Sequence, residues 1–292
     1  MKNSGLWFAK VIGFWMNLCP RWLQKAVAWT LGFLWWDLLR LRRFTIYRNL
    51  TIVFPDLSKE EKKRIARESL YWMGYNFLEF LKLPQLGPKS VRQRAVFNNI
   101  ENYEAARAQG KGVYFLSLHL GNGDVGTAMM TMAGIPCHLI SKKFKQKWLN
   151  DFWFGVREMK GTKFIDPHGR KTPFEILKAV NAGEVVIFVL DQFMGKPYGI
   201  DSTFFGRRTG TAYGLALFAL KTGSPVVPVY TVTDKDGRLQ IYFDRPIPQI
   251  SEENRDLQIA QMTAEYNRAL ERIILRHPEQ WMWVHRRWKT WE

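Results

Sequence analysis

Residues 112–130 read GVYFLSLHLGNGDVGTAMM. The apolar run at 113–118 ends at His119, two glycines then flank Asn122, and a second apolar segment follows Asp124. This order is typical of a buried strand that turns on its glycines into a helix. A strand end fixes side chains rigidly, and a helix N-terminus presents free N–H groups. The stretch therefore predicts a functional site at His119, with Asp124 near enough across the turn to hydrogen-bond one imidazole nitrogen.

From this stretch to the C-terminus, strand patterns alternate with helix patterns. We expect strands at 113–118, 137–140, 185–190, 225–232 and 239–243, and helices at 125–132, 144–159, 174–181, 212–221 and 257–275. Upstream we expect a long amphipathic helix over 58–83 that opens with a capping box, a strand at 91–97 and a short helix at 101–109. The alternation predicts an α/β fold, a mixed central sheet flanked by helices, in a single domain over residues 45–292.

Residues 6–39 form the most apolar region of the chain. Charged residues and Pro20 interrupt it, and its uncharged piece at 26–36 is shorter than the ~20 residues that a helix needs to span a bilayer. Six tryptophans lie in this region, and arginines follow it at positions 40, 42 and 43. Aromatic rings beside basic residues are typical of a membrane interface. We therefore expect residues 1–44 to be a membrane-anchoring helical region on or partly in the bilayer; the alternative is an amphipathic helix packed on the domain.

The chain carries 43 Lys and Arg residues against 26 Asp and Glu, a net charge of +17. This excess predicts an anionic partner, such as a lipid surface, an acidic protein or a phosphorylated substrate. No nucleic-acid-binding motif is present, so we expect no nucleic-acid partner. The five histidines are dispersed, and the glycines near His119 fit neither a phosphate loop nor a dinucleotide fingerprint. We therefore expect no metal and no resident cofactor, and the two cysteines indicate a reducing compartment.

The chemistry open to His119 is proton transfer. A neutral imidazole can take the proton from a hydroxyl during attack on an acyl carbon, and a carboxylate on the other ring nitrogen fixes the tautomer. No G-x-S-x-G elbow offers a covalent nucleophile, so direct transfer between two bound substrates is the simpler hypothesis. The alternative is a strand-end histidine whose hydrogen bonds a nearby aspartate satisfies, with no catalytic role.

Several further motifs follow His119–Asp124 in order. They are Asp191-Gln192, TFFG at 203–206 followed by Arg207 and Arg208, LFALKTGSPVVP at 217–228 and PEQWMWVHRRWK at 278–289. Together they resemble the H-x4-D/E glycerolipid acyltransferase superfamily, in its branch of lipid A late acyltransferases (lauroyl and myristoyl transferases). The resemblance covers nearly the whole chain. Asp124 stands where this branch more often carries Glu, which weakens the inference that the acceptor is lipid A.

The resemblance implies a membrane-associated O-acyltransferase. It would move a fatty acyl chain from a thioester donor, acyl carrier protein or coenzyme A, to a hydroxyl of a phosphorylated lipid A precursor in lipopolysaccharide biosynthesis. It implies His119 as general base oriented by Asp124, acyl carrier protein and anionic membrane lipids as partners, and the cytoplasmic face of the bacterial inner membrane as location. Two alternatives stay open: another acceptor (a lysophospholipid, aminolipid or glycolipid), or a non-enzymatic basic membrane-binding protein.

Five residues are substrate-binding candidates: Asn122, Lys142, Asp191, Arg207 and Arg208. The two arginines could bind the phosphates of the acceptor or of the carrier, or belong to a solvated basic loop. Asp191 could hold an acceptor hydroxyl, or form a structural ion pair with Arg207. Lys142 opens a basic run, with lysines at 143, 145 and 147, that could dock an acidic carrier protein or be a solvated face. Backbone N–H groups at 121–123 or at 142 are candidates to stabilise the oxyanion.

Overall fold

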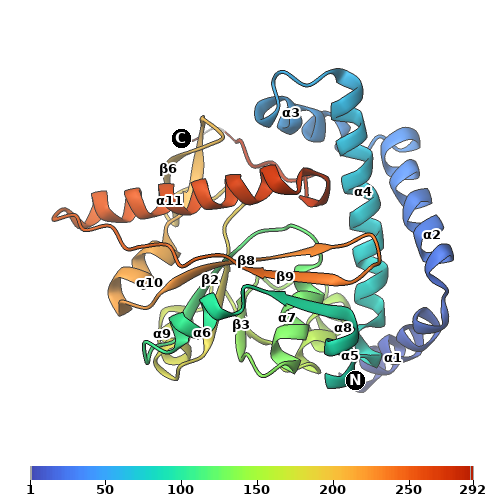
Figure 1. The fold of residues 1–292 in the computed structure, drawn as a ribbon, viewed down its shortest axis with the longest axis horizontal. Coiled ribbons are helices and arrows are strands. Elements are labelled where there is room, and N and C mark those ends of the chain that lie inside the picture. Colours follow the sequence, from blue (N-terminus) through green and yellow to red (C-terminus); the bar gives the residue numbers. More distant parts are fainter. Residues whose placement is uncertain (1, 290, 292) are drawn as a thin grey trace.

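A seven-stranded sheet runs through the described part of the protein (Figure 1). The structure is a computed structural model that describes residues 2–289 and 291, with side chains from residue 6. The strand order is β1 (Ala95–Asn98), β9 (Leu239–Phe243), β8 (Val226–Thr233), β2 (Val113–Ser117), β5 (Val185–Val189), β3 (Cys137–Ile140) and β4 (Lys163–Ile165). Neighbouring strands are parallel except β8 and β9, which are antiparallel. The predicted α/β fold with a mixed central sheet is confirmed.

Strand β2 lies in the middle of the sheet, between β5 and β8. Its residues alternate between two hydrophobic cores, because successive side chains of a strand point to opposite faces. Phe115 lies in the core formed with helices α6 (Glu101–Arg107), α7 (Gly123–Met132) and α8 (Lys147–Glu158). Leu116 lies in the core formed with α9 (Thr172–Asn181), α10 (Gly214–Thr222) and α11 (Arg255–Arg276). Burial on both faces explains why this segment is continuously apolar.

The N-terminal helices pack against the long helix α4 (Lys59–Lys82), which Figure 1 shows beside α2 (Arg21–Phe33). Small residues let α2 and α4 approach closely: a Cβ on Gly32 would lie 3.1 Å from the Tyr71 nitrogen, and one on Gly74 would lie 3.3 Å from the Ala28 oxygen. Helix α1 (Lys2–Leu18) packs on both α4 and α8. The N-terminal helices are therefore packed on the domain along one side, and the membrane-anchoring role expected for residues 1–44 stays a prediction. None of the described helices is both long and apolar enough to cross a membrane.

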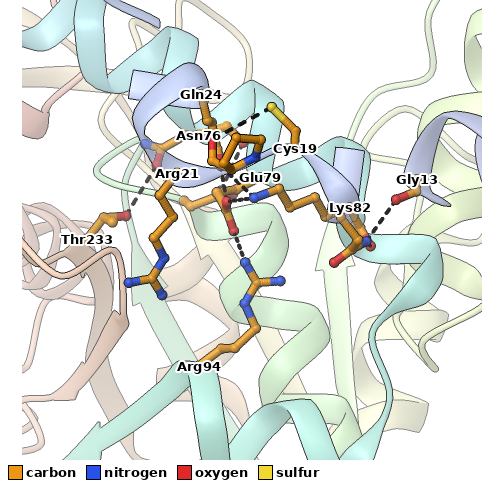
Figure 2. A network of polar contacts seen from close by, with 12 residues as sticks. Gly13, Cys19, Arg21, Gln24, Asn76, Glu79, Lys82, Arg94 and Thr233 are labelled. Atoms are coloured by element: carbon orange, nitrogen blue, oxygen red, sulfur yellow. Dashed lines mark hydrogen bonds and ion pairs between the residues drawn. The ribbon is translucent and has the colours of Figure 1, made fainter. Parts of the chain in front are cut away.

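A buried polar network fastens α2 to α4 (Figure 2). The carboxylate of Glu79 accepts hydrogen bonds from Lys82 at 2.7 Å and from Arg94 of α5 (Pro88–Arg94) at 2.6 Å. It also accepts one at 2.6 Å from Gln24 of α2, whose amide oxygen in turn accepts from Lys82 at 2.5 Å. Charges this deeply buried are tolerated only when they are paired and hydrogen-bonded. The N-terminal helices are thus joined to the domain by specific polar contacts as well as by apolar packing.

Most other predicted elements are present, with several differences, one of which is the short strand β4, which was not expected. The capping box forms, because Ser58 accepts from the Glu61 amide while the Glu61 carboxylate accepts from the Ser58 amide. The strand expected at 91–97 is wrong for its first half: α5 extends to Arg94, since Pro88 at its first turn favours a helix, and β1 follows. The hairpin of β6 (Gly199–Phe204) and β7 (Arg207–Ala212) was not expected. Helix α3 (Arg43–Val53) contains residue 44, where the anchoring region was expected to end.

The turn between β2 and α7 is held by close backbone contact at Gly121. Gly121 has a φ of +60°, and a Cβ there would lie 2.1 Å from the carbonyl oxygen of Thr231 on β8. We expect Gly121→Ala to lower the free energy of unfolding by at least about 2 kcal/mol, measured by urea denaturation. Gly123→Ala is the matched control, because that position is open and its substitution should change stability by less than about 1 kcal/mol. Equal stabilities of the two variants would contradict this account of the turn.

Candidate active site

His119 and Asp191 lie side by side because of the register of two parallel strands. Ser117 ends β2 opposite Val189, which ends β5, and the two functional residues follow two positions later on each strand. The Asp191 carboxylate accepts from His119 Nδ1 at 2.8 Å and from the His119 backbone N–H at 3.0 Å. It also accepts from the indole Nε1 of Trp281 at 2.8 Å. This fully buried carboxylate therefore fixes both the position and the tautomer of the imidazole.

The contact between the two side chains lowers the pKa of Asp191 and raises the pKa of His119. Burial raises the pKa of Asp191, but the charge and hydrogen bond of His119 outweigh it and hold the pKa far below its usual range. Burial lowers the pKa of His119, and the Asp191 carboxylate more than offsets this, with a smaller contribution from Asp124, so the pKa is raised. With Nδ1 donating to Asp191, the neutral ring keeps its lone pair on Nε2. The His119 side chain is 33% exposed, which leaves the ring open to a substrate.

Asp124 does not make the hydrogen bond to His119 that the sequence suggested. It lies in the first turn of α7, and its carboxylate pairs at 2.6 Å with Nη1 of Arg157 on α8. The register of β2 and β5 explains the difference, since it brings Asp191 directly to Nδ1. Arg157 is 2% exposed, and its guanidinium packs on the rings of Phe154 and Phe164 at 4.9 and 4.6 Å from their centroids. Asp124 is thus a neighbouring charge of the site, held by a buried arginine that the sequence analysis missed.

A second histidine and a glutamine complete the surroundings of His119. The amide Nε2 of Gln192 lies 3.2 Å from Nε2 of His119 and 3.2 Å from Nε2 of His285. The two imidazole rings are 4.7 Å apart between centroids. Burial, together with the charges of His119 and Arg42, lowers the pKa of His285 to about 4, so this ring is neutral near pH 7. Trp281 and His285 both belong to the motif at 278–289, whose closing position in the chain gave no indication that it contacts the site.

The remaining candidate residues have different surroundings. Asn122 is buried and caps α7, with Oδ1 accepting from the Val125 amide at 3.2 Å and Nδ2 donating to the Asn76 carbonyl at 3.0 Å.

Arg208 pairs with Asp201 at 2.7 Å, and Arg207 is exposed beside it. The suggested pair of Asp191 with Arg207 is therefore wrong, because His119 and Trp281 occupy the carboxylate. Lys142 is exposed in the loop after β3. Among the described residues, no cluster of His, Cys, Asp or Glu could hold a metal ion.

A family model described as bacterial lipid A biosynthesis acyltransferase matches residues 1–290. The chain belongs to this family. The resemblance inferred from the ordered motifs is therefore confirmed, and the protein is an acyltransferase. The alternative of a non-enzymatic membrane-binding protein is set aside.

Individual relatives of this acyltransferase agree with the family assignment. The lipid A biosynthesis lauroyltransferase of Escherichia coli K12 is 25% identical over 256 residues, 86% of this chain and 80% of that protein. The palmitoleoyltransferase of the same organism is 28% identical over 262 residues, with the same coverage of both chains. A lipid A biosynthesis acyltransferase of Haemophilus influenzae is 20% identical over 281 residues, 96% of this chain and 86% of that protein.

The Asp124–Arg157 pair makes a prediction about stability. Asp124→Ala leaves the buried guanidinium without its partner and should lower the free energy of unfolding by about 3 kcal/mol. The double variant Asp124→Ala/Arg157→Met removes both charges and should regain most of that loss, as measured by urea denaturation. If the double variant is less stable than Asp124→Ala by a further 2 kcal/mol or so, the ion pair with Arg157 is not how Asp124 contributes to the free energy of unfolding.

Proposed function

We propose that this acyltransferase moves a fatty acyl chain from a thioester donor to a hydroxyl group of a lipid A precursor, with His119 as the general base. The observation that carries the proposal is the geometry of His119: its Nδ1 is bound to a buried carboxylate, and its Nε2 lies beside the Gln192 amide on a side chain that is 33% exposed. We assign the orienting role to Asp191 in place of Asp124, because Asp191 makes the hydrogen bond. The names of the relatives support lipid A as the acceptor class.

The reaction follows from these positions. The acceptor hydroxyl replaces the Gln192 amide at His119 Nε2 and gives up its proton as its oxygen attacks the thioester carbonyl. Asp191 stabilises the imidazolium that forms. When the tetrahedral intermediate collapses, the carbon–sulfur bond breaks, the ester remains on the acceptor, and the imidazolium returns its proton to the thiolate. No covalent enzyme intermediate is required.

The oxyanion of the tetrahedral intermediate needs hydrogen-bond donors. The Gly121 amide donates to the Gln280 carbonyl at 3.0 Å, so it is already engaged. Among the described hydrogen bonds, the amides of Gly123 and Asp124 at the first turn of α7 have no acceptor, and Gly123 is exposed. We assign the oxyanion to these two amides in preference to Gly121 or Lys142, because the α7 helix dipole adds to their effect.

The expected donor is acyl carrier protein. The lysines at 142, 143, 145 and 147 are all exposed around the start of α8, together with Phe144 and Trp148, which are 40% and 69% exposed. A basic surface with apolar residues at its centre suits an acidic partner protein. Coenzyme A is the alternative donor, and activity with each thioester decides between them.

The N-terminal helices are the proposed contact with the membrane. Trp7, Trp15, Trp22 and Trp29 are each between 64% and 69% exposed, which is unusual for the largest aromatic side chain. Indole rings in such numbers favour the interface of a bilayer, and the basic net charge favours anionic lipids. We therefore propose that α1 and α2 lie on the cytoplasmic face of the bacterial inner membrane, where a lipid acceptor and a carrier-bound donor can meet.

The pH dependence of acyl transfer tests the roles of His119 and its partners. His119→Ala should lower kcat/KM by on the order of 10³-fold. In the wild type, kcat/KM should fall as the pH drops through the His119 pKa, which lies above its ordinary value because of Asp191. Asp191→Asn removes that carboxylate, so this acidic limb should move to lower pH while the plateau rate also falls.

Asp124→Asn is the matched control for this experiment. It removes a charge that also raises the His119 pKa but makes no hydrogen bond to the ring. The acidic limb of the pH profile of kcat/KM should therefore shift less than it does with Asp191→Asn. A larger shift with Asp124→Asn would return the orienting role to Asp124. A wild-type rate retained by His119→Ala would overturn the proposed mechanism altogether.

Membrane binding can be tested without removing the N-terminal helices, whose inner faces are packed on α4. Changing the four exposed tryptophans at 7, 15, 22 and 29 to Gln should weaken binding to phosphatidylglycerol-containing vesicles more than about tenfold in a sedimentation assay. The matched control changes four other exposed apolar residues to Gln, at positions 174, 198, 257 and 275, and should bind as the wild type does. Equal binding by both variants would contradict the proposed membrane face.

A further inference from the structure

Two adjoining cavities lie between α3, the β6–β7 hairpin and the C-terminal segment. Their volumes are about 610 and 470 Å³, and they share Arg48, Gly206 and Arg207, so together they form one groove. The first cavity is mainly apolar, and the second is basic. None of the described residues that line either cavity is acidic. We call this feature the α3 groove.

At the basic end of the α3 groove, several cationic side chains have no acidic partner among the described residues. Arg48, Arg207, Arg208 and Lys289 line the second cavity. Asp201 neutralises Arg208 through two hydrogen bonds of 3.0 and 2.9 Å. The other three side chains are exposed, and no described carboxylate pairs with them. Guanidinium groups gathered without acidic partners suit a phosphate, which carries more than one negative charge and several strong acceptors.

The apolar end is built from rings and aliphatic side chains. Phe44, Tyr47, Ile52, Pro55 and Phe205 line the first cavity, and Phe44 is 80% exposed. Shortly before it in the chain, Leu38, Leu39 and Leu41 are also exposed, at 65%, 59% and 48%. Exposed apolar residues on this scale mark a surface for lipid or another apolar ligand. The groove therefore offers a phosphate site at one end and a path for an acyl chain at the other.

The hairpin turn that supplies Phe205 and Arg207 has a strained backbone. Phe205 and Gly206 both have positive φ angles, +50° and +68°, as a tight two-residue hairpin turn of type I′ requires. A bulky residue rarely adopts this conformation, which costs on its own and persists only where the surroundings hold it. Here the Phe205 amide donates to the Glu271 carboxylate at 2.6 Å. The turn thus holds Phe205 at the apolar end of the groove and Arg207 where the two cavities meet.

The groove and the His119 site share the C-terminal segment, which contacts helix α3 on one side and Asp191 on the other. Helix α3, which lines the groove, also holds the C-terminal segment, because Asn49 donates to the carbonyls of Trp283 and His285 at 2.9 and 2.7 Å. Trp288 lines the basic end, and its ring centroid lies 6.3 Å from that of Trp281, which is bound to Asp191. Helix α3 and the C-terminal segment therefore join the groove to the His119 site.

We propose that the α3 groove is the acceptor's phosphate subsite, in which Arg48, Arg207 and Lys289 bind a phosphate and the apolar end holds a chain of the same lipid. The proposal rests on the proposed function, since it names where that acceptor binds. The apolar lining at one end of the groove and the basic lining at the other suit a lipid that carries both a chain and a phosphate; binding of the carrier's phosphate is an outcome that the test below distinguishes.

The test compares binding and turnover with two acceptors, a phosphorylated lipid A precursor and the same lipid after phosphatase treatment. Arg48→Ala/Arg207→Ala should raise the Kd for the phosphorylated lipid in detergent micelles tenfold or more, measured by titration calorimetry. Phosphatase treatment should weaken wild-type binding by a similar factor and change the double variant's Kd less than about twofold. Arg245→Ala removes an exposed arginine outside the groove and should bind as the wild type does.

The binding and turnover measurements can refute the subsite and the proposed function independently. If phosphatase treatment weakens the double variant as much as the wild type, the groove is not the phosphate subsite, whatever the rate of acyl transfer. A rise in KM for the acyl donor in place of the acceptor would assign the groove to the carrier and also overturn the proposal. If the wild type binds the lipid but transfers no acyl chain, the proposed function fails while the subsite stands. Because the substituted arginines are exposed, both variants should keep the wild-type Tm.

Discussion

The fully buried carboxylate of Asp191 is the constraint on which the site depends. It receives three hydrogen bonds, from the backbone and ring of His119 and from the indole of Trp281. It therefore connects the end of β2 to the end of β5 and to the C-terminal segment. A carboxylate without water must be satisfied by such donors, or it would be protonated. The same contacts that make the carboxylate tolerable in the core also fix the orientation of the imidazole.

The sequence predicted the strand and helix that carry the candidate site better than the hydrogen-bond partners within it. The apolar run ending at His119 and the glycine turn led directly to β2 and α7, because burial on both faces leaves a clear pattern. The partner of His119 depends on the order of strands in the sheet, which an isolated sequence does not reveal. Asp191 carried a signal nonetheless, since it follows an apolar strand at the same offset as His119.

Other features left weaker signals. Arg157 lies in the last turn of α8, where a basic residue is ordinary, so only the packed structure identifies Asp124 as its partner. The β6–β7 hairpin is short and polar, and its turn is formed by Phe-Gly, which is not a common turn sequence. The N-terminal helices show a similar ambiguity: the tryptophans suggested a membrane, while the small residues that pack α2 on α4 are apparent only from the contacts. Both features are consistent, because one helix can use opposite faces for the two purposes.

In the proposed mechanism, the position of Gln192 has a consequence for a thioester donor that binds before the acceptor. Its amide lies at hydrogen-bonding distance from Nε2 of His119 and from Nε2 of His285, and both rings accept from it when neutral. While that contact is made, the lone pair of the base is occupied and does not activate a water molecule. If His119 is the base, we expect this contact to slow hydrolysis of the donor until an acceptor hydroxyl displaces the amide. On this mechanism the glutamine would make the lone pair of His119 available only when the second substrate arrives, so that the thioester is spent on acyl transfer and not on water.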